Sequence, residues 1–219
     1  MTVALDAAGA EAAGPWIDRA KPTLPSLIDS GHVLDELLGI VNVPMGVWID
    51  EHGLIVRPPE PAFPWRPRKP TDELLAQLPP LLVEQMKEAQ NIRIEPEPYL
   101  AALRDWVARG ADSPYALGPE EVLQRSRPRS AERSRAAASF ELGQYLHRQG
   151  HPDDAVAWFR EAHRLQPENW TYKRQAWSLA DPLQGPTEAY DSDFLTEIRA
   201  LGAENFYAPA KLEDPPATR

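Results

Sequence analysis

The chain has 219 residues, of which 42% are hydrophobic, so it is long enough to bury one sizeable core or two modest ones. Its net charge of -10 argues against a general nucleic-acid binder, because phosphate binding depends on a basic surface that releases counterions. It contains no cysteine, which excludes disulfides, thiolate metal sites and cysteine nucleophiles. No apolar run approaches the roughly 20 residues needed to span a bilayer, and the first residues carry no secretion signal. As written, the sequence predicts a globular cytoplasmic protein with more than one part, no membrane segment and no cofactor.

One stretch departs from the acidic balance of the chain. It contains Arg125, Arg127, Arg129, Arg133 and Arg135. Acidic residues lie close by in the sequence, and no aromatic residue interleaves with the arginines for base stacking. We interpret the stretch as a solvated helix face and its approach.

The first residues alternate short apolar runs with helical periodicity. Met1–Asp6 is a continuous apolar run ending in an acid, which is typical of a strand buried on both faces of a sheet. A helix is expected over Ala12–Ala20, with Pro15 in its first turn. A strand over Ser26–Asp29 and a helix over His32–Leu38 follow. The pattern therefore predicts strand, helix, strand, helix.

A β-hairpin is the firmest local prediction. Gly46–Asp50 and Leu54–Arg57 are apolar runs joined by Glu51, His52 and Gly53. Glycine can take the positive φ that a tight hairpin turn needs. Trp48 lies in the first run, where alternation sends it to the face opposite Val47 and Ile49, under the helical region.

Six of the 24 prolines fall between Pro58 and Pro70. Such a segment cannot pair in a central strand or form a helix, so we expect an extended, semi-rigid connector anchored by Phe63 and Trp65. A proline-rich ligand for a small recognition domain is an alternative use. Helical periodicity follows, and helices are expected over 71–78, 81–90, 98–109, 119–125, 130–148, 152–165 and 170–179. The expected fold class is α/β over residues 1–57, then all-α over residues 71–219.

The segment from Leu37 to Val56 reads Leu-Leu-Gly-Ile-Val-Asn-Val-Pro-Met-Gly-Val-Trp-Ile-Asp-Glu-His-Gly-Leu-Ile-Val. It places a short helix, a Val-Pro pair, an apolar strand ending in Ile-Asp, a glycine turn and Ile-Val in order. With this order, residues 1–57 resemble the C-terminal part of thioredoxin-like proteins, closest to the redoxin branch of ResA- and TlpA-type thiol oxidoreductases and peroxiredoxins. The resemblance implies a partial thioredoxin-like fold and thiol-disulfide exchange or peroxide reduction.

The same resemblance implies a substrate-binding loop at Val43 and Pro44. In that family the proline at the position of Pro44 is cis and sits beside the redox-active cysteine. The residue before it, here Val43, offers its backbone to the substrate polypeptide. No catalytic residue can be assigned in this chain.

The sequence departs from the family in lacking the N-terminal strand, the redox helix and every cysteine. We therefore expect this cysteine-free chain to be inactive as an oxidoreductase. A gene start assigned too late would explain the missing segment, and a selenocysteine codon read as a stop is one cause. We expect an upstream strand that pairs with Met1–Asp6, because that run is too apolar for a free edge. Localisation would then depend on the missing segment.

Residues 136–169 resemble a single tetratricopeptide repeat of 34 residues. Small residues at Gly143, Ala155 and Ala162 would let two helices approach, with a turn near Gly150 and Pro152. One repeat cannot bury its own face, since such arrays need about three units. It would form either a peptide-binding groove or a helical hairpin packed against its own domain, and no second repeat is detectable.

Three histidines have a spacing that could in principle ligate a metal ion. His147 and His151 stand four apart, and His163 lies in the next helix. Gly150 and Pro152 break the helix between the first two, and no carboxylate completes a catalytic pattern. We interpret them as surface histidines, with no metal site.

Two functions therefore follow from the sequence. The first is a redoxin-family oxidoreductase whose redox residue lies outside this chain. The alternative is a non-enzymatic protein-interaction module that binds a protein or peptide partner through its tetratricopeptide-like helical region.

Overall fold

A computed structural model describes residues 1–126 and 128–212. The chain forms two compact units, each assembled from two separate stretches of sequence. Unit 1 contains Met1–Val41 and Pro128–Asp191, and unit 2 contains Asn42–Arg127 and Ser192–Arg219. These limits differ from the division at residues 57 and 70 expected from the sequence, because each unit takes part of the α/β segment and part of the helical segment.

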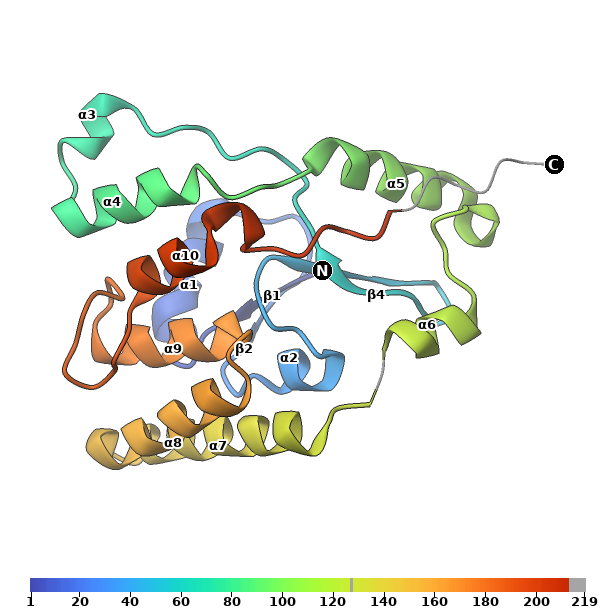
Figure 1. Ribbon diagram of the computed structural model, residues 1–219. Helices are drawn as coiled ribbons and strands as arrows, with labels where there is room; N and C mark the ends of the chain where they lie inside the picture. The colour runs from blue at the N-terminus through green and yellow to red at the C-terminus, as the bar shows by residue number, and fades with distance from the viewer. Residues whose placement is uncertain (127, 213–219) are drawn as a thin grey trace. The chain divides into compact units, whose positions relative to one another are not determined.

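Unit 1 combines a parallel strand pair with helices from two separate stretches of the sequence (Figure 1). Its elements are β1 (Thr2–Leu5), α1 (Ala10–Ala20), β2 (Ser26–Asp29), α2 (Val33–Leu38), α7 (Ala131–Arg148), α8 (Pro152–Leu165) and α9 (Trp170–Ala180). β1 pairs with β2 in parallel, with Thr2 opposite Ser26 and Leu5 opposite Asp29. The predicted strand, helix, strand, helix order is confirmed.

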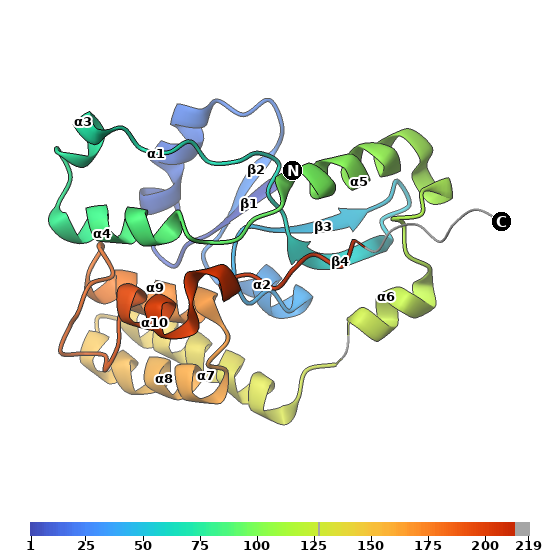
Figure 2. The same ribbon diagram turned by 45° about the horizontal axis from the view of Figure 1, so that its top comes forward.

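Unit 2 is built on the predicted hairpin, which lies beside α5 in Figure 2. Its elements are β3 (Met45–Ile49), β4 (Ile55–Pro61), α3 (Asp72–Leu75), α4 (Pro80–Ala89), α5 (Pro96–Arg109), η1 (Gly110–Asp112), α6 (Pro119–Arg125), α10 (Phe194–Leu201) and η2 (Ala203–Asn205). Gly53 takes φ +80 in the turn. The Asp50 carboxylate accepts the N–H groups of His52 and Leu54 at 2.9 and 2.8 Å, which fixes the turn.

Trp48 anchors the core of unit 2. It is 3% exposed and packs against Tyr99 and Ala102 of α5, and its ring stacks on that of Trp106 at 4.9 Å between centroids. Its indole N–H donates to the Tyr99 hydroxyl at 3.2 Å. The prediction that Trp48 lies beneath a helix is confirmed.

Two local predictions were wrong. The strand β4 continues through Pro58 and Pro59 to Pro61 instead of ending at Arg57. The two prolines fall between the pairs Trp48–Arg57 and Gly46–Glu60, where the register shifts, so no ladder hydrogen bond needs their missing N–H groups. Pro15 lies in the middle of α1 and not in its first turn.

The structure also changes three larger expectations. The strands form two separate two-stranded sheets, β1–β2 and β3–β4, so no single thioredoxin-like sheet is present among the described residues. The helices after residue 71 are divided between the two units, so they do not make up one separate all-α region. In the connector, Phe63 packs edge-on against Tyr207 at 5.0 Å, but Trp65 is 69% exposed and anchors nothing.

Candidate functional site

The helix pair α7–α8 forms as predicted for residues 136–169. The Ser130 hydroxyl caps α7 by accepting the Arg133 N–H at 3.2 Å, and Gly150 takes φ +82 in the turn before Pro152. At the crossing, a Cβ added to Gly143 would lie 2.8 Å from two ring carbons of Phe159. Glycine is therefore required here, because only the missing side chain lets the Phe159 ring sit against the α7 backbone.

A second face of α7 is covered by other parts of unit 1. Ala137, Phe140 and Gln144 on this face are all buried. The Phe140 ring stacks on Tyr172 of α9 at 4.2 Å and meets the His32 ring edge-on at 5.1 Å. His32 precedes α2, so the chain itself fills the place where a peptide would lie on this face. This supports the interpretation of a helical hairpin packed against its own domain.

The covered face contains polar groups that sequence reasoning missed. His32 Nδ1 lies 3.1 Å from Asp35 Oδ2, and both side chains are at most 2% exposed. Within the described residues, His32 Nε2, Asp35 Oδ1 and both amide atoms of Gln144 have no hydrogen-bond partner. Burial, and then the charges of Asp35 and Glu36, raise the pKa of the Tyr172 hydroxyl well above 10.0. Tyr172 therefore stays neutral in the folded chain.

The Val43–Pro44 loop lies in unit 2, and its peptide bond is cis. Val43 is 40% exposed, yet its backbone groups are both engaged. Its carbonyl accepts the Tyr207 hydroxyl at 2.6 Å, and its N–H donates to Asn42 Oδ1 at 2.9 Å. Asn42 in turn donates to the Phe206 carbonyl at 3.1 Å. A substrate strand would have to replace these internal bonds, so the binding role of Val43 and Pro44 stays a prediction.

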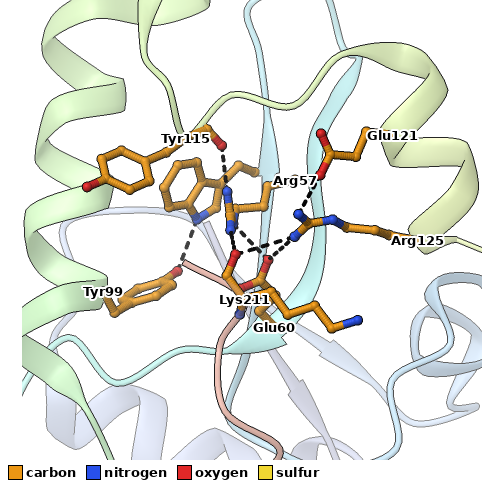
Figure 3. A network of polar contacts seen from close by, with 8 residues as sticks. Arg57, Glu60, Tyr99, Tyr115, Glu121, Arg125 and Lys211 are labelled. Carbon is orange, nitrogen blue, oxygen red and sulfur yellow. Dashed lines mark hydrogen bonds and ion pairs between the residues drawn. The ribbon is translucent and has the colours of Figure 1, made fainter. Parts of the chain in front are cut away.

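A buried ion-pair network in unit 2 was not predicted from the sequence (Figure 3). Arg57 of β4 pairs with Glu60 at 2.7 Å and donates to the carbonyls of Tyr115 and Lys211 at 2.7 and 2.6 Å. Arg125 of α6 lies 3.7 Å from the same Glu60 carboxylate. These two ion pairs and two hydrogen bonds connect β4 to α6, to the loop before α6 and to the segment after α10. The only sequence signal was an arginine in an apolar strand next to prolines.

The other residues singled out in the sequence are the basic stretch and the three histidines. The described arginines of the basic stretch pair with carboxylates: Arg125 with Glu121, Arg129 with Glu36, Arg133 with Glu168 and Arg135 with Glu161. Arg127 lies outside the described residues. Within the described part of the chain, no three side chains of histidine, aspartate or glutamate lie together in a way that could hold a metal ion. In the same part, no helix is both long and apolar enough to cross a membrane.

Comparison with known families gives one finding for the helix pair. A family model described as the tetratricopeptide repeat matches residues 136–169, which is less than a fifth of the chain. Comparison with curated proteins and with solved structures gives no match. The resemblance of residues 1–57 to thioredoxin-like proteins receives no support from these comparisons.

Proposed function

We propose that this chain is a non-enzymatic protein-interaction module that binds a peptide segment of a partner protein. The tetratricopeptide match at residues 136–169 carries the proposal, because repeats of this class commonly mediate protein interactions. The α7–α8 pair has the packing of such a repeat, with Gly143 against Phe159. Because one face of α7 is already covered by other parts of unit 1, a ligand would not bind in a groove along α7. It would bind beside the helix pair, which then acts as a structural support.

Panning of displayed random peptides against the immobilised full-length chain tests this function. We expect enrichment of a peptide family whose synthetic members bind saturably, with dissociation constants in the micromolar range, by fluorescence anisotropy. A matched control is the Trp65→Ala chain, since Trp65 is 69% exposed. Failure to enrich any peptide that binds saturably would contradict the proposal.

The second candidate is a redoxin-family oxidoreductase whose redox residue is supplied from outside this sequence. The order β1, α1, β2, α2, β3, β4 supports it, because this is the order that the resemblance implies. The family's chemistry needs an ionised sulfur or selenium nucleophile, and no side chain here provides one.

Two measurements test the second candidate. The purified 219-residue chain should show no disulfide reductase or peroxidase turnover above background. The bases before the start codon should encode, in frame, a strand, a loop with a redox residue and a helix. An upstream frame with no such segment, or thiol turnover by the chain itself, would eliminate this candidate in its present form.

A further inference from the structure

The outer edge of β1 is an unused hydrogen-bonding edge. The Thr2 N–H donates to the Pro25 carbonyl at 3.0 Å, and the Asp6 N–H donates to the Asp29 carbonyl at 3.4 Å. Alternate residues of a parallel strand direct their backbone groups to opposite edges. Val3 and Leu5 therefore direct their N–H and C=O groups away from β2. Among residues 1–126 and 128–212, these groups have no hydrogen-bond partner.

This edge lacks the devices that protect exposed strands. Proteins block free edges with proline, charge or a covering segment, because an open edge pairs with other chains. The other free edge, on β2, follows Pro25 and ends at Asp29. β1 has no proline and no charge between Thr2 and Leu5, and Val3 and Leu5 are half-buried. A parallel pair of two apolar strands is also too small to be stable alone, so β1 is suited to accept a further strand.

An apolar cleft of about 1170 Å³ opens beside this strand, entirely within unit 1. Three of its lining residues, Thr2, Ala4 and Leu5, come from β1 and only Ser26 comes from β2, so the cleft follows β1. Leu5, Trp16, Ile17 and Leu24 form its apolar wall, and Trp16 is 69% exposed. The volume exceeds the roughly 300–1,000 Å³ of clefts that hold one small ligand.

The charges around the cleft indicate what it would bind. Asp6 contributes one negative charge and Lys21 one positive charge to the lining, and these balance. A charged ligand would therefore gain no net electrostatic attraction from the lining. Apolar side chains on an extended backbone would fill the cleft, and the backbone would pair with the free edge. Backbone pairing combined with pockets for alternate side chains is the known logic of β-strand addition.

We propose that β1 and this cleft bind an extended, uncharged apolar segment of a partner protein, which adds as a third strand beside Val3 and Leu5. The proposal rests on the peptide-binding function proposed above and gives it a location and a ligand chemistry. The partner's backbone would exchange hydrogen bonds with Val3 and Leu5, and every second side chain would enter the cleft against α1.

The test uses the full-length chain and a defined probe, an acetylated and amidated heptapeptide that alternates valine and threonine between terminal lysines. Residue-resolved amide exchange is measured with and without the peptide. We expect exchange of the Val3 and Leu5 amides to slow at least tenfold, whereas Ala4, whose N–H faces β2, should change little. No slowing at Val3 and Leu5 at a saturating peptide concentration would overturn the proposal.

Variants of probe and protein then test the strand geometry. Methylating the peptide N–H groups one at a time should weaken binding at alternate positions only, and equal losses at every position would contradict strand addition. Val3→Pro removes an outward N–H and should weaken binding at least tenfold, whereas Ile28→Pro removes the matching outward N–H of β2 and should not. The methylated peptides remain decisive if Val3→Pro disturbs folding.

Two further outcomes separate this inference from the proposed function. Concentration-dependent dimers that protect Val3 and Leu5 without peptide would mean that a second copy occupies the edge, which overturns the proposal. Panned peptides that bind while leaving Val3 and Leu5 unprotected would also overturn the site, but would leave the protein-binding function standing.

Discussion

At the residue scale, two buried polar groups make opposite contributions. Gln144 buries an amide that has no partner within the described residues. Arg57 is almost as deeply buried, yet its guanidinium meets a carboxylate and two carbonyls. The Arg57 Nε contact with Glu60 is an ion pair without hydrogen-bond geometry. An unpartnered buried polar group costs free energy, whereas a charge paired with an opposite charge becomes more costly when its partner is removed.

We predict that Gln144→Met stabilises the chain. Methionine fills a similar volume and removes an amide whose burial is uncompensated, so the free energy of unfolding should rise by about 1–2 kcal/mol. Denaturant titration measures the change, with Gln149→Met on the exposed end of the same helix as the control. A loss of stability would show that the Gln144 amide has a partner in solution.

We predict the opposite for Arg57→Met, because Glu60 would keep a buried charge and lose its nearest cation, leaving Arg125 at 3.7 Å and the Lys211 N–H at 3.1 Å. The loss should be about 3–5 kcal/mol. The double variant Arg57→Met/Glu60→Gln should lose less than the sum of the two single variants, since the pair is coupled. Additive losses in the same denaturant titrations would show that the ion pair contributes no coupling energy.

At the element scale, local pattern predicted most helices and strands. α6 and α8 begin and end at the predicted residues, because Pro119 and Pro152 mark their first turns. The helix α10 was missed although Asp193 caps it by accepting the Leu195 and Thr196 N–H groups. The continuation of β4 through Pro58 and Pro59 was missed because it depends on a register shift that only the paired strand reveals.

The helix crossing gives the clearest prediction at this scale. Gly143→Ala should lower the free energy of unfolding by about 1–3 kcal/mol, because the new methyl group would overlap the Phe159 ring, which is 1% exposed and cannot move freely. Gly14→Ala in α1 is the control, since nothing lies within 4 Å of its added Cβ, and it should be neutral or stabilising. Equal effects of the two substitutions would mean that α7 and α8 do not cross at Gly143.

At the scale of the whole molecule, the sequence could not predict the two units. Each joins segments separated by more than 60 residues, as when the Trp170 N–H donates to the Val41 carbonyl at 2.7 Å or the Arg57 guanidinium donates to the Lys211 carbonyl. Hydrophobic periodicity predicts whether a local segment is a helix or a strand, and it contains no information about contacts between distant segments. The sequence predicted a covered face of α7 only as one of two alternatives. The ring that covers it belongs to His32, which lies far from α7 in the sequence.

The tyrosines predict how the stability of the chain depends on pH. Burial is the main cause that raises the pKa values of Tyr172 and Tyr190 above 10.0. Above pH 10 the unfolded chain therefore loses these protons while the folded chain keeps them, and stability falls as pH rises. Tyr172→Phe should reduce that fall by about 1 kcal/mol between pH 10 and 11, measured by denaturation at each pH. Tyr190→Phe should also reduce the fall, and an unchanged fall for both variants would refute the assignment.

The central claim is that the helix pair is a closed scaffold and that a partner peptide binds beside it. Amide exchange of the full-length chain with a panned, saturably binding peptide tests this most directly. The account predicts slowed exchange in β1 and the start of α1, with no increase in exchange at His32 or Leu34. Faster exchange around His32, together with new protection along Ala137–Gln144, would show that the peptide displaces α2 from α7, and would contradict the account.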